Sequence, residues 1–453
     1  MFLAKVYLKI TVILAYYYKT SSSLYTYEPT WESLDKRPLP QWYDDAKIGV
    51  FLHWGVYSVP SFGSEWFWHN WKNGDEDYIS FMKKNYPPDF TYQSFAKEFK
   101  AEFFDPQAWV KLFEQSGAKY VVITSKHHEG YTLWPSEYSF SWNARDIGPG
   151  RNLLEEFSNA VKKSSLKFGV YHSLYEWFNL MYVKDKNHNF TTDNFVVYKI
   201  LPELYELVTN FKPDIVWSDG EWESTDEYWK STEFLAWLYN ESPVRDRVVV
   251  NDRWGNNTRC QHGDFFTCAD GYNPGVLQSH KWENAMTIDM HSWGYRRNAN
   301  VDDYHTTQSL IQILTETVSC GGNILMNVGP RHDGTIDPIF QDRLLNLGKW
   351  LITNGEAIYS TKPWLNQKDS LSTTWFTSKP PYVYAITLSW PQNNTLKLGK
   401  VPPTFKDKNT EVKLLGYEKT LNWTLDGDGV NIEFPDKAVV STDWAWVVKI
   451  KDQ

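Results

Sequence analysis

The chain has 453 residues, too many for one small core, so we expect a large domain with a smaller partner. Hydrophobic residues make up 42% and charged residues 22%, which excludes a wholly disordered chain. The net charge is -9, and no run of Lys or Arg is long enough to follow a phosphate backbone. Nucleic acid is therefore not an expected partner.

The N-terminus is predicted to be a secretory signal peptide over residues 1–23. Lysines precede an apolar run from Ile10 to Tyr18, and serines follow it. The run is too short to anchor the protein in a bilayer. We therefore expect no membrane anchor and a place in the secretory pathway, either lysosomal or secreted. Glycosylation on that route is indicated by sequons at Asn189, Asn240, Asn256, Asn393 and Asn422.

Apolar runs typical of buried strands alternate with helical patterns from about residue 47 to residue 355. The predicted strands are Ile48–Leu52, Tyr120–Thr124, Phe168–Tyr171, Ile215–Trp217, Val248–Val250 and Asn323–Met326. Helices are expected between them, for example at 105–115 and 153–163. The first of these has Pro106 at its start and Gly117 after its end. This alternation predicts an α/β fold with a (β/α)8-like (TIM-type) barrel, which we place at residues 24–355.

The last hundred residues consist of short β-rich runs separated by turns. Val383–Leu388 and Trp446–Ile450 are two such runs, and the Asp-Gly-Asp-Gly segment 426–429 is a strong turn signal. These patterns predict a C-terminal β-sandwich domain over residues 356–453.

Three cysteines are too few for a disulfide framework. Cys260 and Cys268 are close enough in sequence to form a disulfide across a small loop in an oxidising compartment. Cys320 is then left over, and a buried free thiol is its expected role. Because no zinc-type spacing accompanies the cysteines, we expect no metal and no cofactor.

Polar and aromatic side chains follow five consecutive predicted strands. The principal ones are His53, Trp54, Lys126, His127, His128, Glu129, His172, Glu176, Trp177, Asp219, Asn251, Asp252, Arg253 and Trp254. The carboxyl ends of barrel strands converge on one mouth, so we expect these side chains to share a pocket. Metal binding is the alternative role for His127 and His128. Adjacent residues on a strand point to opposite faces, so both would reach one ion only from a loop.

The segment Trp217–Glu223 places three acids and two tryptophans where the fourth predicted strand ends. Gly220 permits a sharp turn that would direct Asp219 into the pocket. Glycoside cleavage needs two carboxylates, while tryptophans bind the flat apolar face of a sugar ring. An acidic turn without chemistry is the plainer alternative. Glu221 and Glu223 are interpreted as supporting or surface residues.

The chain resembles the animal-type α-L-fucosidases, retaining glycoside hydrolases of family 29, along nearly its whole mature length. The segments that carry the resemblance are Phe51–Gly55, Ser64–Phe67, Thr124–Gly130, Trp217–Trp222, Asn251–Gly255, Lys281–Glu283, Ser292–Tyr295 and Gly321–Pro330. The family implies an often irregular barrel followed by a β-sandwich. It also implies fucosylated glycans as binding partners, and its members often form homo-oligomers.

The resemblance implies a role for each matched residue. Asp219 would be the nucleophile and would form a covalent fucosyl-enzyme that water then hydrolyses. The residues expected to line the fucose pocket are His53, Glu65, Trp66, His127, His128, Tyr171 and Arg253.

Two matched positions compete for the role of acid/base. They are Asp270 and Glu283, and a general acid needs a raised pKa. If the segment is extended, Lys281 projects to the same face as Glu283, and its ammonium would lower the pKa of that carboxyl. We therefore favour Asp270, whose loop the disulfide between Cys260 and Cys268 would help to hold, and keep Glu283 as the alternative.

One departure from the family pattern concerns the motif that ends at a cysteine after Lys-Trp-Glu. Ala285 stands at that cysteine position. We interpret the thiol as dispensable, because two carboxylates suffice for the mechanism. A catalytically inactive, fucose-binding lectin-like homologue is the alternative function, and a retaining hydrolase for another sugar is a third.

Overall fold

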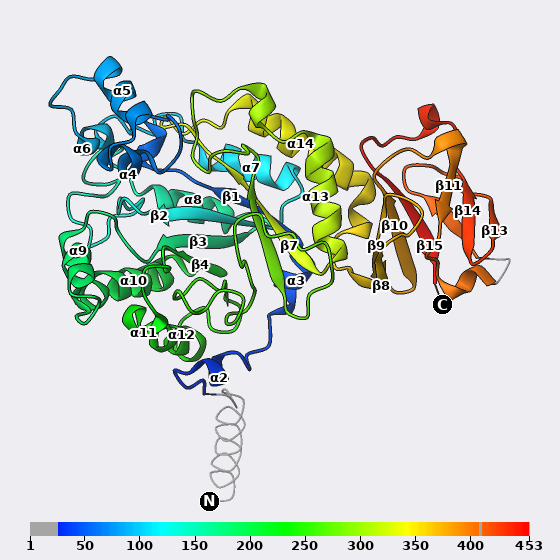
Figure 1. Ribbon diagram of the computed structural model, residues 1–453, viewed down its shortest axis with the longest axis horizontal. Coiled ribbons are helices and arrows are strands. Elements are labelled where there is room, and N and C mark those ends of the chain that lie inside the picture. The colour runs from blue at the N-terminus through cyan, green and yellow to red at the C-terminus, as the bar shows by residue number, and fades with distance from the viewer. Residues whose placement is uncertain (1–25, 407–409, 453) are drawn as a thin grey trace, which may run out of the picture.

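The computed structural model describes residues 26–406 and 410–452, and the predicted signal peptide lies outside them. The chain forms an α/β part followed by a β-rich part, which lie side by side in Figure 1. Within the described ranges, no helix combines the length and the apolar character needed to cross a membrane.

Seven parallel strands form one curled sheet in the described α/β part, in the order β5-β4-β3-β2-β1-β7-β6. They are β1 (Ile48–Leu52), β2 (Tyr120–Lys126), β3 (Lys167–Ser173), β4 (Ile215–Asp219), β5 (Val249–Val250), β6 (Trp282–Thr287) and β7 (Gly322–Val328). The barrel-like fold and six predicted strands are thereby confirmed. Strand β6 was not predicted, because Glu283 and Asn284 interrupt its apolar run although both are buried.

An irregular segment at residues 264–267 spans the two edges of this sheet. The backbone N–H groups of Asp264 and Phe265 donate to the carbonyl of Val250 at 3.1 and 3.3 Å. On the other side, Phe266 N donates to Lys281 O at 2.9 Å, and Phe266 O accepts from Glu283 N at 2.8 Å. Because Phe266 pairs with β6 in parallel, the residues after 267 continue toward the carboxyl ends of the strands.

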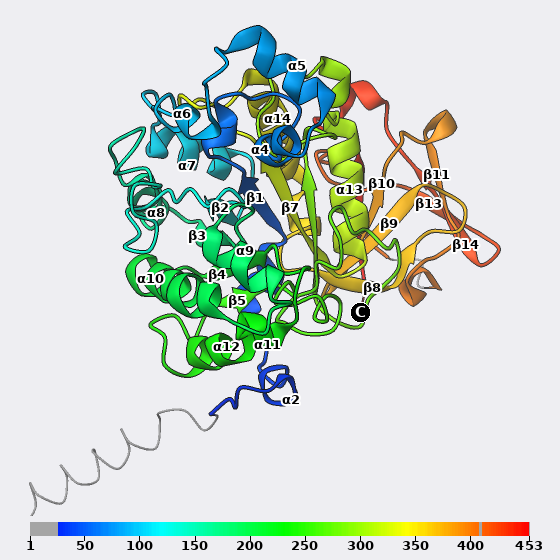
Figure 2. The same cartoon turned by 60° about the vertical axis from the view of Figure 1, so that its left-hand side comes forward.

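Helices surround the sheet, as Figures 1 and 2 show. They are α2 (Trp31–Leu34), α3 (Gln41–Ala46), α4 (Phe67–Lys72), α5 (Glu76–Asn85), α6 (Tyr92–Ala96), α7 (Pro106–Gln115), α8 (Leu153–Val161), α9 (Leu180–Asn187), α10 (Leu201–Phe211), α11 (Asp226–Trp229), α12 (Ser231–Asn240), α13 (Thr307–Ser319) and α14 (Pro338–Asn354). Short 3-10 or π turns are η1 (Val56–Ser58), η2 (Val196–Ile200), η3 (Val301–Asp303), η4 (Gly355–Ala357), η5 (Gln392–Asn394), η6 (Pro403–Lys406) and η7 (Lys437–Val439).

Local signals explain where helix α7 begins and ends. The Asp105 carboxylate caps it by accepting from the backbone N–H groups of Gln107 and Ala108, and Pro106 occupies its first position. Just beyond its end, Gly117 has φ of 86°, a conformation that favours glycine. Helix α8 ends at Val161, slightly earlier than predicted.

The C-terminal part consists of two antiparallel sheets. One contains β12 (Val412–Leu414), β15 (Trp446–Lys451), β10 (Tyr382–Thr387), β9 (Thr374–Lys379) and β8 (Lys362–Lys368), in that order. The other contains β11 (Thr395–Leu398), β14 (Gly429–Glu433) and β13 (Trp423–Asp426). The predicted turn joins β13 to β14, where Asp426 pairs with Gly429.

Helices α13 and α14 connect the two parts (Figure 2). The Gln308 amide donates to the carbonyls of Leu388 and Trp444 at 3.1 and 2.7 Å, and the Trp350 indole donates to Ala445 O at 2.9 Å. Buried Tyr384 and Val447 belong to the same hydrophobic core as both helices. The β-rich part therefore packs against helices α13 and α14.

Candidate active site

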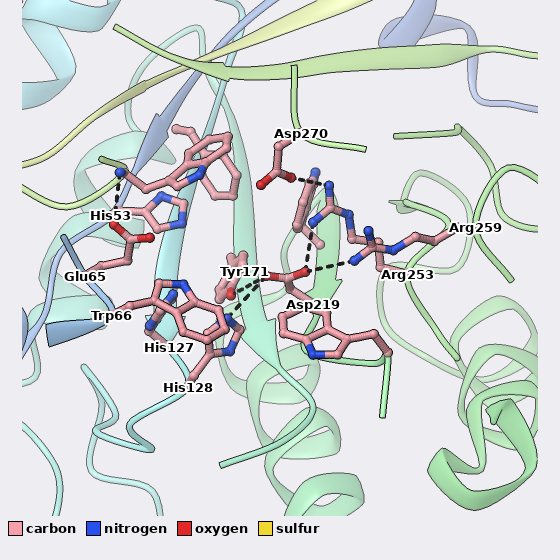
Figure 3. Close-up of a pocket in the computed structure, with 14 residues that line it drawn as sticks. His53, Glu65, Trp66, His127, His128, Tyr171, Asp219, Arg253, Arg259 and Asp270 are labelled. Atoms are coloured by element: carbon pink, nitrogen blue, oxygen red, sulfur yellow. Dashed lines mark hydrogen bonds and ion pairs between the residues drawn. The ribbon is translucent and has the colours of Figure 1, made fainter. Parts of the chain in front are cut away.

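A cavity of about 320 Å³ opens at the carboxyl ends of the parallel strands (Figure 3). The residues predicted for the sugar pocket and the favoured acid/base lie along it: His53, Glu65, Trp66, His127, His128, Tyr171, Asp219, Arg253 and Asp270. Glu283 is not part of this lining. The rest of the wall comes from Phe51, Trp217, Trp222, Arg259 and Trp293.

Asp219 is the last residue of β4, and a tight turn after it directs its side chain into the cavity. Gly220 has φ of 73°, a left-handed conformation. A Cβ atom at this position would lie 2.2 Å from Cδ1 of Tyr175. Both the backbone conformation and the close approach of Tyr175 therefore require glycine directly after the carboxylate.

Both oxygens of the Asp219 carboxylate have hydrogen-bond donors. The Tyr171 hydroxyl, from neighbouring β3, donates to Oδ2 at 2.8 Å. Arg253 Nη1 donates to Oδ1 at 2.9 Å, and Arg259 Nη2 lies 4.0 Å from the same oxygen. His128 Nε2 lies 3.7 Å from Oδ2. The carboxylate is thus held in one orientation next to positive charge.

Arg253 joins the two candidate catalytic carboxyls. Its Nη2 donates to Asp270 Oδ1 at 2.5 Å while its Nη1 binds Asp219, and its Cζ lies 4.7 Å from the centre of the Trp217 ring. Burial alone would lower the pKa of Arg253, but attraction to Asp270 and Asp219 raises it well above its usual value. Arg253 therefore remains a cation throughout the working range of pH.

Asp270 stands on a loop whose conformation depends on Asp252. The Asp252 carboxylate accepts from the backbone N–H groups of Cys260 and Cys268 at 2.8 and 3.1 Å, and from Thr267 N at 2.9 Å. A disulfide joins Cys260 to Cys268, with the Cα atoms 4.9 Å apart. The loop continues to Asp270, whose side chain is 54% exposed at the cavity mouth. Solvent therefore reaches this carboxyl.

Glu283 lies inside the barrel, beneath the cavity. Its carboxylate accepts from the hydroxyls of Tyr43 and Tyr120 at 2.8 and 2.6 Å and from the Trp217 indole at 3.0 Å, and it is fully buried. Burial raises its pKa, and the charge of Lys281 lowers it to a smaller extent. The charge of Lys281 therefore acts in the expected direction, although its ammonium pairs with Asp44 at 2.7 Å, but burial outweighs it. The position of Glu283 outside the cavity lining, and not its pKa, is what argues against an acid/base role.

Three histidines form one side of the cavity. His53 Nδ1 lies 2.8 Å from Asn327 Oδ1, and His128 Nδ1 lies 2.7 Å from Ser173 Oγ. Burial, followed by repulsion from His127, lowers the pKa of His53 to about 3 and that of His128 well below its usual value. Both rings are consequently neutral at mildly acidic pH and can exchange hydrogen bonds with hydroxyl groups.

His127 and His128 follow the end of β2 and lie in a loop, with ring centres 4.0 Å apart. In the described part of the chain, the grouping of side chains with metal-like spacing is Asp252, Cys260 and Cys268. Its two sulfur atoms are joined in a disulfide, so they offer no thiolate ligands.

Glu65 and Trp66 close the cavity opposite Asp219. Glu65 Oε2 accepts from the backbone N–H groups of Trp293 and Gly294 at 3.0 and 3.1 Å. This arrangement leaves Oε1 available to a ligand. The Trp66 ring lies nearly parallel to Trp222 at 6.3 Å, so the two indoles present an apolar wall beside the polar groups.

The pocket residues absent from our expected set carried unequal signals in the sequence. Trp217, Trp222 and Trp293 lie within the segments that carry the family resemblance, and Phe51 begins another. Arg259 follows a sequon and precedes Cys260, and no motif marks it. Ala285 is fully buried inside the barrel and does not line the cavity. Its carbonyl accepts from the backbone N–H of Gly271, the residue after Asp270, at 2.7 Å.

The cavity has carboxylates at the mouth of a parallel α/β barrel, opposite neutral histidines and tryptophan rings. This combination is typical of a glycoside hydrolase. Comparison with known proteins is more specific. The α-L-fucosidase family model matches residues 14–356, and the model of the α-L-fucosidase C-terminal domain matches residues 367–451. The chain belongs to the α-L-fucosidase family.

Relatives cover nearly the whole chain. An α-L-fucosidase of Branchiostoma floridae is 55% identical over 94% of this chain and 96% of its own. Tissue α-L-fucosidase of Bos taurus is 53% identical over 94% of this chain and 91% of its own. Thermotoga maritima α-fucosidase, solved with a mechanism-based inhibitor, is 32% identical with a TM-score of 0.83, over 94% of this chain and all of that one.

Proposed function

We propose that this protein is a retaining exo-glycosidase that removes terminal α-L-fucose from glycoproteins, glycolipids or oligosaccharides. The observation that carries the proposal is the position of Asp219 and Asp270 on the two terminal nitrogens of Arg253. Both carboxyls therefore face one cavity, and glycoside cleavage needs two carboxyls at one bond. The resemblance to the retaining enzymes of family 29 favours retention of configuration.

In the first step, Asp219 attacks the anomeric carbon of fucose. Oδ forms an ester bond to that carbon, and the bond to the glycosidic oxygen breaks. Asp270 gives its proton to the departing oxygen. Arg253 and Tyr171 hold Asp219 in line for the attack. Glu65, His53 and His128 bind the ring hydroxyls. The Trp66 ring packs against the apolar face of the sugar.

In the second step, water hydrolyses the fucosyl ester. Asp270, now ionised, takes a proton from the water, whose oxygen bonds to the anomeric carbon. The ester bond breaks, and its electron pair returns to Asp219. Two inversions restore the original configuration. Glu283 takes no part in these steps, because it binds the Trp217 indole N–H from inside the barrel and does not line the cavity.

Two further points extend the same proposal. The relatives include proteins named tissue and plasma α-L-fucosidases, which supports a lysosomal or secreted location. Fucosylated glycans are the partners that the pocket suits, and a homo-oligomer is the assembly that the family resemblance favours.

The test is release of nitrophenol from the α-L-fucoside compared with the galactoside, repeated with Asp219→Gly. We expect turnover of the fucoside alone and its loss in the variant. Glu223→Gln is the matched control, because this acid of the same segment binds Lys186 and lies outside the cavity lining. Fucose binding without turnover would favour the lectin-like alternative, and preferred turnover of the galactoside would favour another hydrolase.

A further inference from the structure

Glu221 is a fully buried carboxylate two residues beyond Asp219. Its Oε1 accepts a hydrogen bond from Arg259 Nε, and its backbone carbonyl accepts from the Trp229 indole at 3.0 Å. Its Oε2 is buried and has no hydrogen-bond partner among the described residues. A buried carboxylate with one half unpaired is costly to the folded state, so stability alone does not account for it.

Arg259 extends from this buried carboxylate into the cavity. Its guanidinium lies 5.7 Å from the centre of the Trp222 ring, and Nη2 is 4.0 Å from Asp219 Oδ1. Figure 3 shows Arg259 and Arg253 on the same side of Asp219, opposite Glu65 and His53. The Arg259 side chain remains 32% exposed, so it is not a buried structural cation. Its Nε is bound, and its Nη2 faces the nucleophile.

We propose that Glu221 positions Arg259 as a second cation at Asp219, and that this cation promotes the departure of fucose from the Asp219 ester. The inference rests on the proposed function, because it needs a covalent intermediate on Asp219. In that step water attacks the anomeric carbon, the ester C–O bond breaks, and the Asp219 oxygen receives the electron pair as negative charge. Arg259 faces the oxygen at which Arg253 already donates.

The position of the charge makes the expected effect specific to one step. A cation near the carboxylate stabilises it both before attack and after release. It therefore makes Asp219 a better leaving group in the second step and a weaker nucleophile in the first. A purely structural contact would not divide the two steps in this way. Loss of Arg259 should consequently slow deglycosylation while leaving glycosylation unchanged or faster.

The experiment is stopped-flow hydrolysis of 2,4-dinitrophenyl α-L-fucoside by the full chain. This leaving group departs without protonation, so breakdown of the fucosyl-enzyme limits turnover and a burst of dinitrophenol reports the first step. For Arg259→Met we expect steady-state kcat to fall on the order of tenfold, with the burst rate unchanged or higher. Arg259→Lys retains the charge and should lose less than Arg259→Met.

Glu221 is tested with a matched pair of variants. Glu221→Gln retains an acceptor for Arg259 Nε and should keep most of the deglycosylation rate. Glu221→Met removes the acceptor and should reproduce the slow second step of Arg259→Met. Since Glu221→Met also leaves a packing change in the interior, its melting temperature is measured alongside, and the burst rate shows whether the first step survives.

The outcomes separate this inference from the proposed function. If wild type shows a burst and Asp219→Gly is inactive, but Arg259→Met matches wild type in both steps, the second-cation role is overturned while the mechanism stands. An equal fall in the burst rate and in the steady-state kcat would also overturn it and would indicate a structural contact. If Arg259→Met lowered kcat with fucosylated disaccharides and not with the aryl fucoside, Arg259 would instead be assigned to binding of the leaving-group sugar. An inactive wild type would overturn both proposals.

Discussion

Asp219 and Asp270 bind the two terminal nitrogens of a single guanidinium group, at 2.9 and 2.5 Å. Arg253, which supplies that group, is fixed in turn by Thr267 at 3.0 Å and by the face of Trp217. The two carboxyls come from segments that are separate in sequence and from differently exposed positions. One arginine therefore sets their relative placement, and the properties of either carboxyl depend on the loop that carries the other.

The acid/base assignment predicts a leaving-group dependence. Asp270→Gly should lower turnover of fucosides with poor leaving groups by about 10²–10⁴-fold, because no other group can protonate the departing oxygen. The rate of the first step should be unchanged with the dinitrophenyl fucoside. Azide should restore turnover by replacing the missing carboxylate. Steady-state kinetics with and without azide measure both effects.

Glu283→Gln is the comparison for that prediction. An amide cannot accept from both tyrosine hydroxyls and the Trp217 indole, so we expect a loss of about 1–3 kcal/mol in the free energy of unfolding. Most of the turnover should remain at temperatures where the variant is folded. Azide rescue of Glu283→Gly and not of Asp270→Gly would reverse the assignment.

The disulfide should matter for the loop that carries Asp270. It closes a short loop, and chain entropy predicts a loss of about 2–3 kcal/mol when Cys260 and Cys268 are both changed to Ala. The Asp252 carboxylate retains its N–H donors, so the variant should fold with a lower melting temperature and a reduced kcat. Cys320→Ala is the control, because this buried free thiol forms no disulfide and packs against Trp282 and Trp375. An unchanged kcat in the double variant would show that Asp252 alone holds the loop.

The five sequons should not be equally occupied. The Asn240 side chain is bound to the N-terminal segment, since Nδ2 donates to Tyr27 O at 2.8 Å and Oδ1 accepts from Tyr27 N at 2.9 Å. Nδ2 is the atom that N-glycosylation modifies, so we expect Asn240 to be bare. The other four side chains are exposed: Asn189, Asn256, Asn393 and Asn422. Enzymatic deglycosylation in heavy-oxygen water followed by peptide mass spectrometry reports each site, and a labelled Asn240 would contradict the prediction.

The stability of the folded chain should depend on pH through the ionisation of Glu221. Burial and repulsion from Asp219 raise its pKa from 4.5 to about 7. Between these values the folded chain holds a proton that the unfolded chain has lost, so this group's contribution to stability falls as pH rises from about 4.5 to 7. Glu221→Gln removes the effect. The melting temperature of the variant minus that of wild type should therefore increase across this range, and a difference independent of pH would count against the raised pKa.

The pattern of the sequence was sufficient for the architecture and for much of the pocket. Apolar runs identified six parallel strands because fully buried strands need no alternation, and Gly220 after Asp219 marked a turn that a side chain would obstruct. Strand β6 was not predicted, because the burial of Glu283 depends on the hydroxyls of Tyr43 and Tyr120, which come from distant parts of the chain. Their proximity cannot be read from a local pattern.

The tertiary structure alone decided which carboxyls meet. Asp270 and Glu283 are only thirteen positions apart and both match the family, yet one reaches the cavity mouth and the other the barrel interior. Residues 264–267 bridge β5 and β6, which turns the loop after them toward Arg253, while β6 directs Glu283 inward. Arg259 likewise acquires its place from Glu221 and Trp222. Side-chain identity therefore determined the chemistry available to this protein, and long-range packing determined the charges that surround each group.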